Sequence, residues 1–117
     1  LVYRQELEGV PGIWFQRDLP GVQHNYGYFP ILVDEAAYGM TRDSLYAALK
    51  EFNIFARKYF YPLCSHFPCY SALPSAAPSC MPVAERVARQ VLCLPIYGEL
   101  AEPVVRTICK VIRHLQG

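Results

Sequence analysis

Hydrophobic and polar positions near the start of the chain predict two short strands. Residues 12–15 (GIWF) form a tight apolar group between Pro11 and a run of turn residues, which favours a strand. Residues 25–34 are rich in Tyr, Phe, Ile and Val and predict a second one. Because Pro30 inside this segment cannot donate to a strand ladder, we expect an edge strand or a bulge there.

A helical pattern follows. Thr41 can cap a helix, and the apolar positions spaced at i, i+3, i+4 and i+7 are Leu45, Ala48, Leu49 and Phe52. Asn53 suits the turn that closes this helix. Residues 54–60, with β-branched and aromatic content, predict a third strand.

The C-terminal part predicts a long loop and two helices. Residues 61–82 contain five prolines, so we expect mostly irregular structure, ordered by its aromatic residues. Pro82 suits the first turn of a helix ending at Leu94, and another helix follows from Glu102 to a stop at Gly117. Residues 1–117 thus predict one α+β domain, a small, mainly antiparallel sheet with helices packed on one face.

Composition excludes several classes of protein. The chain is 53% hydrophobic and 18% charged with a net charge of +1, and no segment concentrates one sign, so we expect no nucleic-acid partner. No apolar run approaches the about 20 residues of a membrane-spanning helix, so we expect no membrane insertion. Five cysteines, an odd number without a CxxC pair or a leader, predict reduced thiols and a cytoplasmic location. We expect Cys93 and Cys109 to be small buried hydrophobes within helices.

Chemistry-bearing clusters are sparse. Cys64, His66, Cys69 and Cys80 contain suitable zinc ligands, but their spacing matches no standard zinc module, so we expect no metal. The sequence lacks a Gly-rich phosphate loop, a G-x-S-x-G motif and an H-E-x-x-H motif. The lysines at positions 50, 58 and 110 are expected to be solvated rather than nucleophilic.

The aromatic density of two segments stands out. Tyr and Phe at positions 26, 28, 29, 59, 60, 61, 67 and 70 are interleaved with His24, Asn25, Arg57 and His66. Core packing explains many such residues. A surface of Tyr hydroxyls beside Arg and His also suits a polar ring stacked on an aromatic face, such as a sugar or a nucleotide. Composition leaves both interpretations open.

The order of several motifs resembles that of a known family. The segments are 25–34 (NYGYFPILVD), 42–50 (RDSLYAALK), 53–62 (NIFARKYFYP), 82–86 (PVAER) and 91–97 (VLCLPIY). They resemble the C-terminal region of the DegT/DnrJ/EryC1/StrS aminotransferases, in which a Tyr-Pro pair precedes a His by four residues. Tyr61, Pro62 and His66 keep that spacing. The sequence of residues 55–62 is similar to the corresponding sequence of members that aminate dTDP-linked keto-6-deoxyhexoses.

The resemblance implies a fold-type-I pyridoxal-phosphate (PLP) enzyme, dimeric, with glutamate as the usual amino donor. This chain would be its C-terminal small domain, a piece of something longer. The cofactor lysine would lie in a large domain, so we expect no cofactor on this chain and no activity from it alone. The small domain would close the site and orient a nucleotide-linked keto-deoxy sugar. The residues that the resemblance assigns to substrate binding are Tyr61, His66, Asn25, Tyr26 and Tyr59.

A different class of function remains open at this point. The chain would then be a stand-alone binding or dimerisation module without catalysis, which pairs through an exposed aromatic strand edge.

Overall fold

Three antiparallel strands form the sheet, in the order β1-β2-β3. The computed structural model describes residues 2–117. The strands are β1 (Ile13–Phe15), β2 (Phe29–Val33) and β3 (Val91–Leu94). Trp14 pairs with Leu32, and Leu32 pairs with Val91, so one row of side chains crosses all three strands. The predicted small antiparallel sheet is confirmed.

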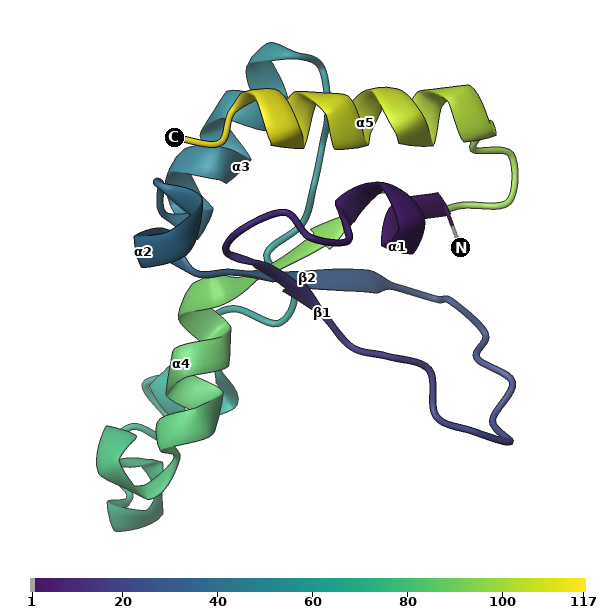
Figure 1. Cartoon of the computed structure of the whole chain (residues 1–117). Helices are drawn as coiled ribbons and strands as arrows, with labels where there is room; N and C mark the ends of the chain where they lie inside the picture. The colour runs from purple at the N-terminus through teal and green to yellow at the C-terminus, as the bar shows by residue number, and fades with distance from the viewer. Residues whose placement is uncertain (1) are drawn as a thin grey trace.

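Most of the helices cover one face of this sheet. The helices are α1 (Val2–Leu7), α2 (Glu35–Tyr38), α3 (Arg42–Glu51), α4 (Pro82–Gln90) and α5 (Glu102–His114), and single 3-10 turns occur at Cys64–His66, Pro74–Ala76 and Pro78–Cys80. In Figure 1, α1, α3 and α5 lie above the sheet, whereas α4 extends below it. The α+β class is confirmed, with α4 as an addition on the second face. Within residues 2–117, no helix is long and apolar enough to cross a lipid bilayer.

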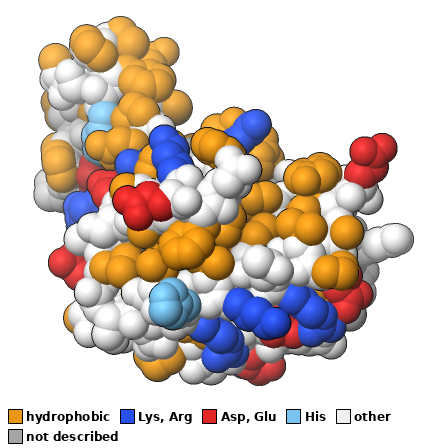
Figure 2. All heavy atoms as spheres, turned by 90° about the horizontal axis from the view of Figure 1, so that it is seen from above, with side chains coloured by type: hydrophobic (Ala, Val, Ile, Leu, Met, Phe, Trp, Pro, Cys, Tyr) orange, Lys and Arg blue, Asp and Glu red, His pale blue; other side chains and the backbone are white. Residues whose placement is uncertain are grey.

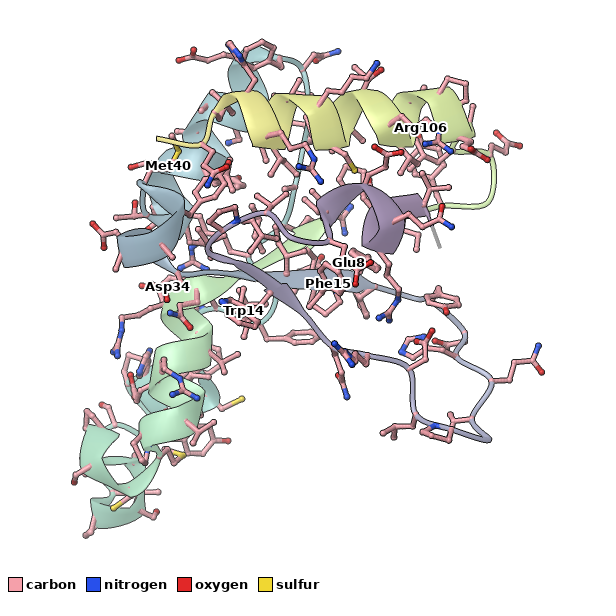
Figure 3. All side chains as sticks on the ribbon, viewed as in Figure 1. Glu8, Trp14, Phe15, Asp34, Met40 and Arg106 are labelled. Carbon is pink, nitrogen blue, oxygen red and sulfur yellow. The ribbon has the colours of Figure 1, made fainter. Side chains whose placement is uncertain are left out.

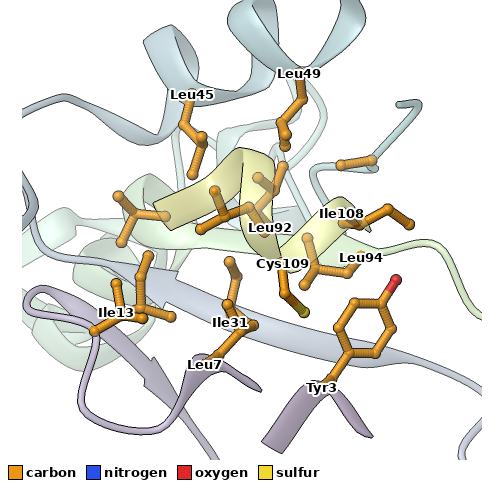
Figure 4. Close-up of a cluster of buried hydrophobic side chains, with 14 of the residues drawn as sticks. Tyr3, Leu7, Ile13, Ile31, Leu45, Leu49, Leu92, Leu94, Ile108 and Cys109 are labelled. Atoms are coloured by element: carbon orange, nitrogen blue, oxygen red, sulfur yellow. The ribbon is translucent and has the colours of Figure 1, made fainter. Parts of the chain in front are cut away.

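The hydrophobic core lies between the upper face of the sheet and these helices (Figure 4). Because alternate residues of a strand share a face, Ile31 and Val33 of β2 point into it, as do Leu92 and Leu94 of β3. The helices contribute fully buried side chains, which include Leu7, Leu45, Leu49, Cys109 and Ile112. This face is therefore closed.

The start of α3 follows the sequence pattern. Thr41 Oγ1 accepts a hydrogen bond from the backbone N–H of Ser44 at 3.0 Å, which confirms the predicted cap. The helix ends at Glu51, so Phe52 lies beyond its last turn and is 48% exposed rather than part of the inner stripe. Asn53 has a φ of 59° and makes the predicted turn.

The prediction of a third strand at residues 54–60 is wrong. A single bridge remains, in which Arg57 N–H donates to Cys93 O at 2.9 Å and Cys93 N–H donates to Arg57 O at 2.7 Å. The chain then turns at once, because Tyr61 N–H donates to Lys58 O at 2.8 Å. Aromatic and β-branched content alone did not distinguish an extended edge segment from a strand.

The helix that begins at Pro82 is shorter than predicted. It ends at Gln90, and residues 91–94 form β3, so Cys93 is buried in a strand and not in a helix. All four residues of β3 are buried, two facing the core and two facing α4 and Tyr59. A short run that is apolar at every position has no period, so it fits a helix and a doubly covered strand equally well.

Pro30 lies in the central strand, and the register runs through it without a break, so neither the predicted edge strand nor the predicted bulge is present. Its partner Cys93 uses both its backbone groups with Arg57, so no hydrogen bond toward β3 is lost at Pro30. On its other side, β1 already ends at Phe15, which pairs with Ile31. The position therefore behaves as a local edge, where proline is tolerated.

Helix α1 was not predicted. Its six residues are too few to show a helical period, and a helix of this length is not stable without tertiary contacts. Tyr3 and Leu7, one turn apart, are buried against the core, and α1 lies along α5. Packing rather than local pattern forms this element.

Candidate functional site

Side chains from three distant segments line a groove of about 520 Å³ below the sheet, which we call the aromatic groove. Its wall consists of Tyr28, Tyr59 and Phe60, and its polar side chains are His24 and Asn25. The apolar floor combines the second face of the sheet with α4, as Pro30, Val91, Cys93, Ala84, Val87 and Ala88.

The aromatic wall is held by contacts between its own rings. The centroids of Tyr28 and Tyr59 lie 5.5 Å apart at 89°, and those of Tyr59 and Phe60 lie 5.3 Å apart at 20°. Edge-to-face and offset-stacked pairs of this kind are favourable beyond the area that they bury. Phe60 nevertheless remains 68% exposed and Tyr28 48% exposed. These two rings are therefore available to a planar ligand.

Asn25, one of the predicted binding residues, lines the groove. Its Oδ1 accepts a hydrogen bond from Gly27 N–H at 3.2 Å, which fixes the amide and leaves its Nδ2 as a donor. His24 Nδ1 accepts from Tyr26 N–H at 2.8 Å, so the proton of the neutral ring is on Nε2. Both side chains thus present N–H donors.

Tyr59, the second predicted residue in the groove, is oriented by Arg57. Arg57 Nη1 donates to the Tyr59 hydroxyl at 2.8 Å, and the guanidinium carbon lies 5.5 Å from the centroid of the same ring. The backbone of Arg57 is in turn fixed by its bridge to Cys93. Because Arg57 contacts both the hydroxyl and the ring of Tyr59, the Tyr59 side chain is held in one orientation.

Tyr26 lies outside the aromatic groove. Its φ of 50° takes it out of the alternation of β2. Its hydroxyl donates to Asp18 Oδ2 at 2.8 Å, and this hydrogen bond is the main reason that the pKa of Tyr26 is raised. Arg4 Nη2 lies 2.9 Å from the same carboxylate. Tyr26 therefore ties the β1–β2 loop to the start of the chain.

Tyr61 faces a different cavity, of about 710 Å³, which it shares with charged side chains that include Asp34, Asp43 and Arg89. The guanidinium carbon of Arg42 lies 5.2 Å from the centroid of the Tyr61 ring. Arg42 is buried, and its Nη1 donates to Val91 O at 2.7 Å. Tyr61 therefore lines this charged cavity and not the aromatic groove that Tyr59 lines.

His66 pairs with α4 rather than lining the groove. Its Nε2 lies 2.8 Å from Glu85 Oε1, which anchors the first 3-10 turn of the loop to the helix that carries Ala84 and Val87. Across residues 2–117, no three His, Cys, Asp or Glu side chains come together as a metal site requires. Within the described residues, His66 therefore contacts Glu85, and Cys64, His66 and Cys69 do not converge on one metal position.

The lysines of this chain contact other side chains or are exposed. Lys58 Nζ lies 2.5 Å from Asp43 Oδ1, and Lys50 Nζ lies 4.4 Å from the centroid of the Tyr46 ring. The Lys50 hydrogen bond, with a smaller effect from Lys58, lowers the pKa of Tyr46. Lys110 is exposed on α5. In the part of the chain that the structure describes, none of them lines the aromatic groove.

Tyr28 and Phe60 are groove residues that the sequence-based selection missed. The alternation of β2 carries a signal for Tyr28, because Phe29, Ile31 and Val33 face the core and the even positions face away. Nothing comparable marks Phe60, which lies in an irregular segment. Its place in the wall depends on how the chain turns after Arg57.

The apolar floor continues toward β1. Trp14 projects from β1 on the side from which α4 extends (Figure 3) and is 65% exposed. It pairs with Leu32, which pairs with Val91 of the groove floor. The second face of the sheet is therefore apolar but only partly covered.

Known proteins share both the sequence and this fold. A curated relative, the dTDP-4-amino-4,6-dideoxy-D-glucose transaminase of Escherichia coli, is 47% identical over 111 residues, covering 95% of this chain and 30% of the relative. A protein with the same description from Shigella dysenteriae is 37% identical over 118 residues, covering 99% of this chain and 31% of the relative. The chain thus spans about 30% of the length of these relatives.

Solved structures of other proteins have the same fold. The structure of DesI in the presence of its TDP-sugar product has a TM-score of 0.86 and 30% identity, covering 97% of this chain and 28% of that one. S. venezuelae DesV has a TM-score of 0.83 and 26% identity, with 96% and 28% covered. The family model of the DegT/DnrJ/EryC1/StrS aminotransferases matches residues 1–113. The chain therefore belongs to the DegT/DnrJ/EryC1/StrS aminotransferase family.

Proposed function

We propose that this chain orients the substrate in an aminotransferase that acts on a nucleotide-linked keto-deoxy sugar. The observation that carries the proposal is the aromatic groove, in which exposed faces of Tyr28 and Phe60 stand beside the N–H donors of Asn25 and His24. An apolar, aromatic-lined concavity with few polar groups is typical of small-molecule sites. One relative is named as a transaminase of a dTDP-linked sugar, and DesI was solved with its TDP-sugar product, which supports a substrate of that class.

In this proposal the groove binds the nucleoside end of the substrate. A planar base would lie against Phe60 and Tyr28 and accept hydrogen bonds from the Asn25 amide. Holding the substrate in one orientation lowers the barrier of the later chemical step by removing its rotational freedom beforehand. Tyr61 and His66 would act beyond this groove, Tyr61 on the charged side and His66 through α4.

The cofactor in this proposal is PLP, which stabilises the carbanion during amino transfer. Because the lysines here are paired or exposed, the PLP lysine would come from a longer protein that contains this segment. We therefore expect the 117-residue chain alone to be inactive. Substrate positioning, rather than bond making, would be its contribution.

A chimera tests the proposal. The N-terminal 70% of the E. coli relative, which this chain does not cover, is joined to residues 1–117 in place of its own C-terminal region. We expect this chimera to aminate a dTDP-linked keto sugar, and the isolated chain with added PLP to be inactive. In the chimera, Phe60→Ala and Tyr28→Ala should each raise the KM for the sugar nucleotide about tenfold and leave the KM for glutamate unchanged.

The matched control is Tyr70→Ala, which removes an exposed aromatic side chain outside the groove. It should leave both KM values unchanged. Turnover by the isolated chain would contradict the assignment of chemistry to the longer protein. Unchanged KM values in the Phe60 and Tyr28 variants of an active chimera would remove the groove from substrate binding.

We also propose that the longer protein is a cytoplasmic homodimer. Hydrophobic side chains gather across the face seen from above (Figure 2). Separately, an apolar groove of about 400 Å³ is lined by Phe55 and Tyr97, which are 63% and 62% exposed. Such surfaces mark protein contacts. Sedimentation of the chimera as a monomer, or a monomer-dimer ratio insensitive to Phe55→Ser, would contradict this interface.

The proposed cytoplasmic location rests on the cysteines. The five cysteines are free, which suits a reducing compartment.

A further inference from the structure

A second depression, of about 330 Å³, adjoins the aromatic groove and shares three lining residues with it, Tyr28, Tyr59 and Cys93. Its other side is lined by Phe55, Tyr97 and Arg57. The ring pair of Tyr28 and Tyr59 is therefore a common wall. A ligand that rests on this wall can extend into both depressions.

The two depressions differ in charge. The aromatic groove, as far as residues 2–117 form it, is lined by no Asp, Glu, Lys or Arg. In the second depression, Arg57 is the one Asp, Glu, Lys or Arg side chain among the described lining residues. A sugar nucleotide carries its negative charge on the diphosphate, which an apolar groove without cations would exclude. Arg57 is thus the local group able to neutralise that charge.

Arg57 is held in place without being neutralised. One of its five N–H groups donates to the Tyr59 hydroxyl at 2.8 Å, and its backbone bridges to Cys93. Other arginines are paired with acids, Arg4 with Asp18 at 2.9 Å and Arg42 with Asp43 at 2.8 Å. Within residues 2–117, no carboxylate lies within 4.0 Å of Arg57.

We propose that Arg57 binds the diphosphate of the nucleotide-linked sugar whose base lies in the aromatic groove. This inference rests on the proposed function and adds a residue that it does not assign. A guanidinium binds phosphate oxygens bidentately, and its remaining N–H groups suffice for that while one holds Tyr59. The competing explanation is that a charged residue at position 57 only protects an exposed sheet edge from pairing with another chain.

The experiment measures binding of thymidine and dTDP to the 117-residue chain by calorimetry. The two ligands share the base and sugar and differ in the diphosphate, so their affinity ratio reports the contribution of the phosphates. We expect dTDP to bind at least about tenfold more tightly than thymidine, with an affinity that falls as salt is added while that of thymidine does not. Arg57→Gln should abolish the tenfold difference between dTDP and thymidine, and any change in the orientation of Tyr59 should affect both ligands alike, so that the ratio of the two affinities isolates the diphosphate contact.

Two further variants sharpen the test. Arg57→Lys keeps the charge but loses the forked geometry, so it should retain part of the preference for dTDP. Arg86→Gln removes the same charge from an exposed position on α4 and should bind both ligands like the original chain. Circular dichroism checks that each variant is folded.

The outcomes separate this inference from the proposed function. If thymidine binds and dTDP binds no better, or if Arg57→Gln keeps the preference, the diphosphate site at Arg57 is overturned while the groove stands. If neither ligand binds at millimolar concentration, the nucleotide assignment of the groove fails and the role of Arg57 fails with it. If a folded Arg57→Gln variant binds both ligands more weakly by the same factor, support of Tyr59 is the whole role of Arg57, which also overturns the inference.

Discussion

The two faces of the sheet differ in how completely their side chains are used. On the upper face, Ile31 and Leu92 are fully buried, and polar atoms reach partners within the core, as when the Tyr38 hydroxyl donates to Ile112 O at 2.6 Å. On the lower side, Trp14 and the groove-wall residue Phe60 both remain more than half exposed. The first face holds the fold together, and the second face is the one to which we assign substrate binding.

The largest expected effect contrasts one leucine of the core with one valine of the lower side. Leu92→Ala removes a fully buried side chain and leaves a cavity, so it should lower the free energy of unfolding by about 4 kcal/mol. Val83→Ala on α4, where the valine is 63% exposed, should lower it by about 0.5 kcal/mol or less. Urea denaturation measures both. Equal losses would mean that α4 is part of the same cooperative core.

The sequence predicted the upper face better than the lower one. Helices α3 and α5 each repeat an apolar stripe over several turns, and the stripe of α5 buries Val105, Ile108, Cys109 and Ile112. Such a pattern is local, so it can be identified in a single sequence. Strand β3 was missed as a strand because its run VLCL is buried on both sides and has no period.

The groove could be predicted only in part. Its lining comes from residues 24–30, 59–63 and 84–93, which approach one another only in the folded chain. The sequence marked an aromatic surface and placed Asn25 and Tyr59 in it, but it also selected Tyr26, which a positive φ turns toward Asp18. Backbone geometry after Arg57 decides where Phe60 and Tyr61 point, and composition does not encode that geometry.

Two glycines with nearly the same φ show how a packed and an open backbone position differ in their tolerance of an added side chain. Gly12 has a φ of 74°, and an added Cβ would lie 2.3 Å from Tyr38 N, whereas Gly21 has a φ of 76° and open space around it. Gly12→Ala should cost about 3 kcal/mol, because the left-handed strain and the clash add. Gly21→Ala should cost about 1 kcal/mol from strain alone. Thermal denaturation compares the two, and an equal cost would show that the contact between Gly12 and Tyr38 yields freely.

Tyr38→Phe tests a buried polar group of the upper face. Burial raises the pKa of Tyr38 from 10.0 to about 12, so the fold favours the neutral phenol. The stabilisation is complete below pH 10 and is lost as the pH rises toward 12. At pH 7 the variant should be less stable by about 1 kcal/mol, since Ile112 O loses its donor.

Between pH 10 and 12 the original protein should therefore lose stability that the Phe variant does not lose, and the two curves should converge and then cross, since a pKa raised from 10.0 to about 12 outweighs a difference of about 1 kcal/mol. Tyr70→Phe, on an exposed tyrosine, is the matched control and should leave the curve unchanged. A constant difference between pH 7 and pH 12 would contradict the buried-phenol explanation.

The smallest expected effect concerns Asp43, which joins the two faces. Its Oδ1 lies 2.8 Å from Nε of the buried Arg42 and 2.5 Å from Nζ of Lys58, which begins the segment of the aromatic wall. Lys58 and, to a smaller extent, Arg42 lower the pKa of Asp43 below 3.8. The stabilisation is therefore present above pH 3.8 and is lost as the pH falls through the lowered value.

Asp43→Asn should destabilise the protein by about 0.5 kcal/mol at pH 7, because the carboxylate is largely exposed and solvent screens both pairs. The difference in melting temperature should narrow as the pH falls below about 4, where the original side chain also becomes neutral. Glu51→Gln removes a charge from an exposed position on α3 and should show no such narrowing. If the Asn variant also shifts the Tyr59 and Phe60 ring resonances in NMR spectra, the ion pairs of Asp43 help to hold the groove wall in position. If those resonances stay in place while the melting temperature falls, the groove wall is held by its own ring contacts and by Arg57 alone.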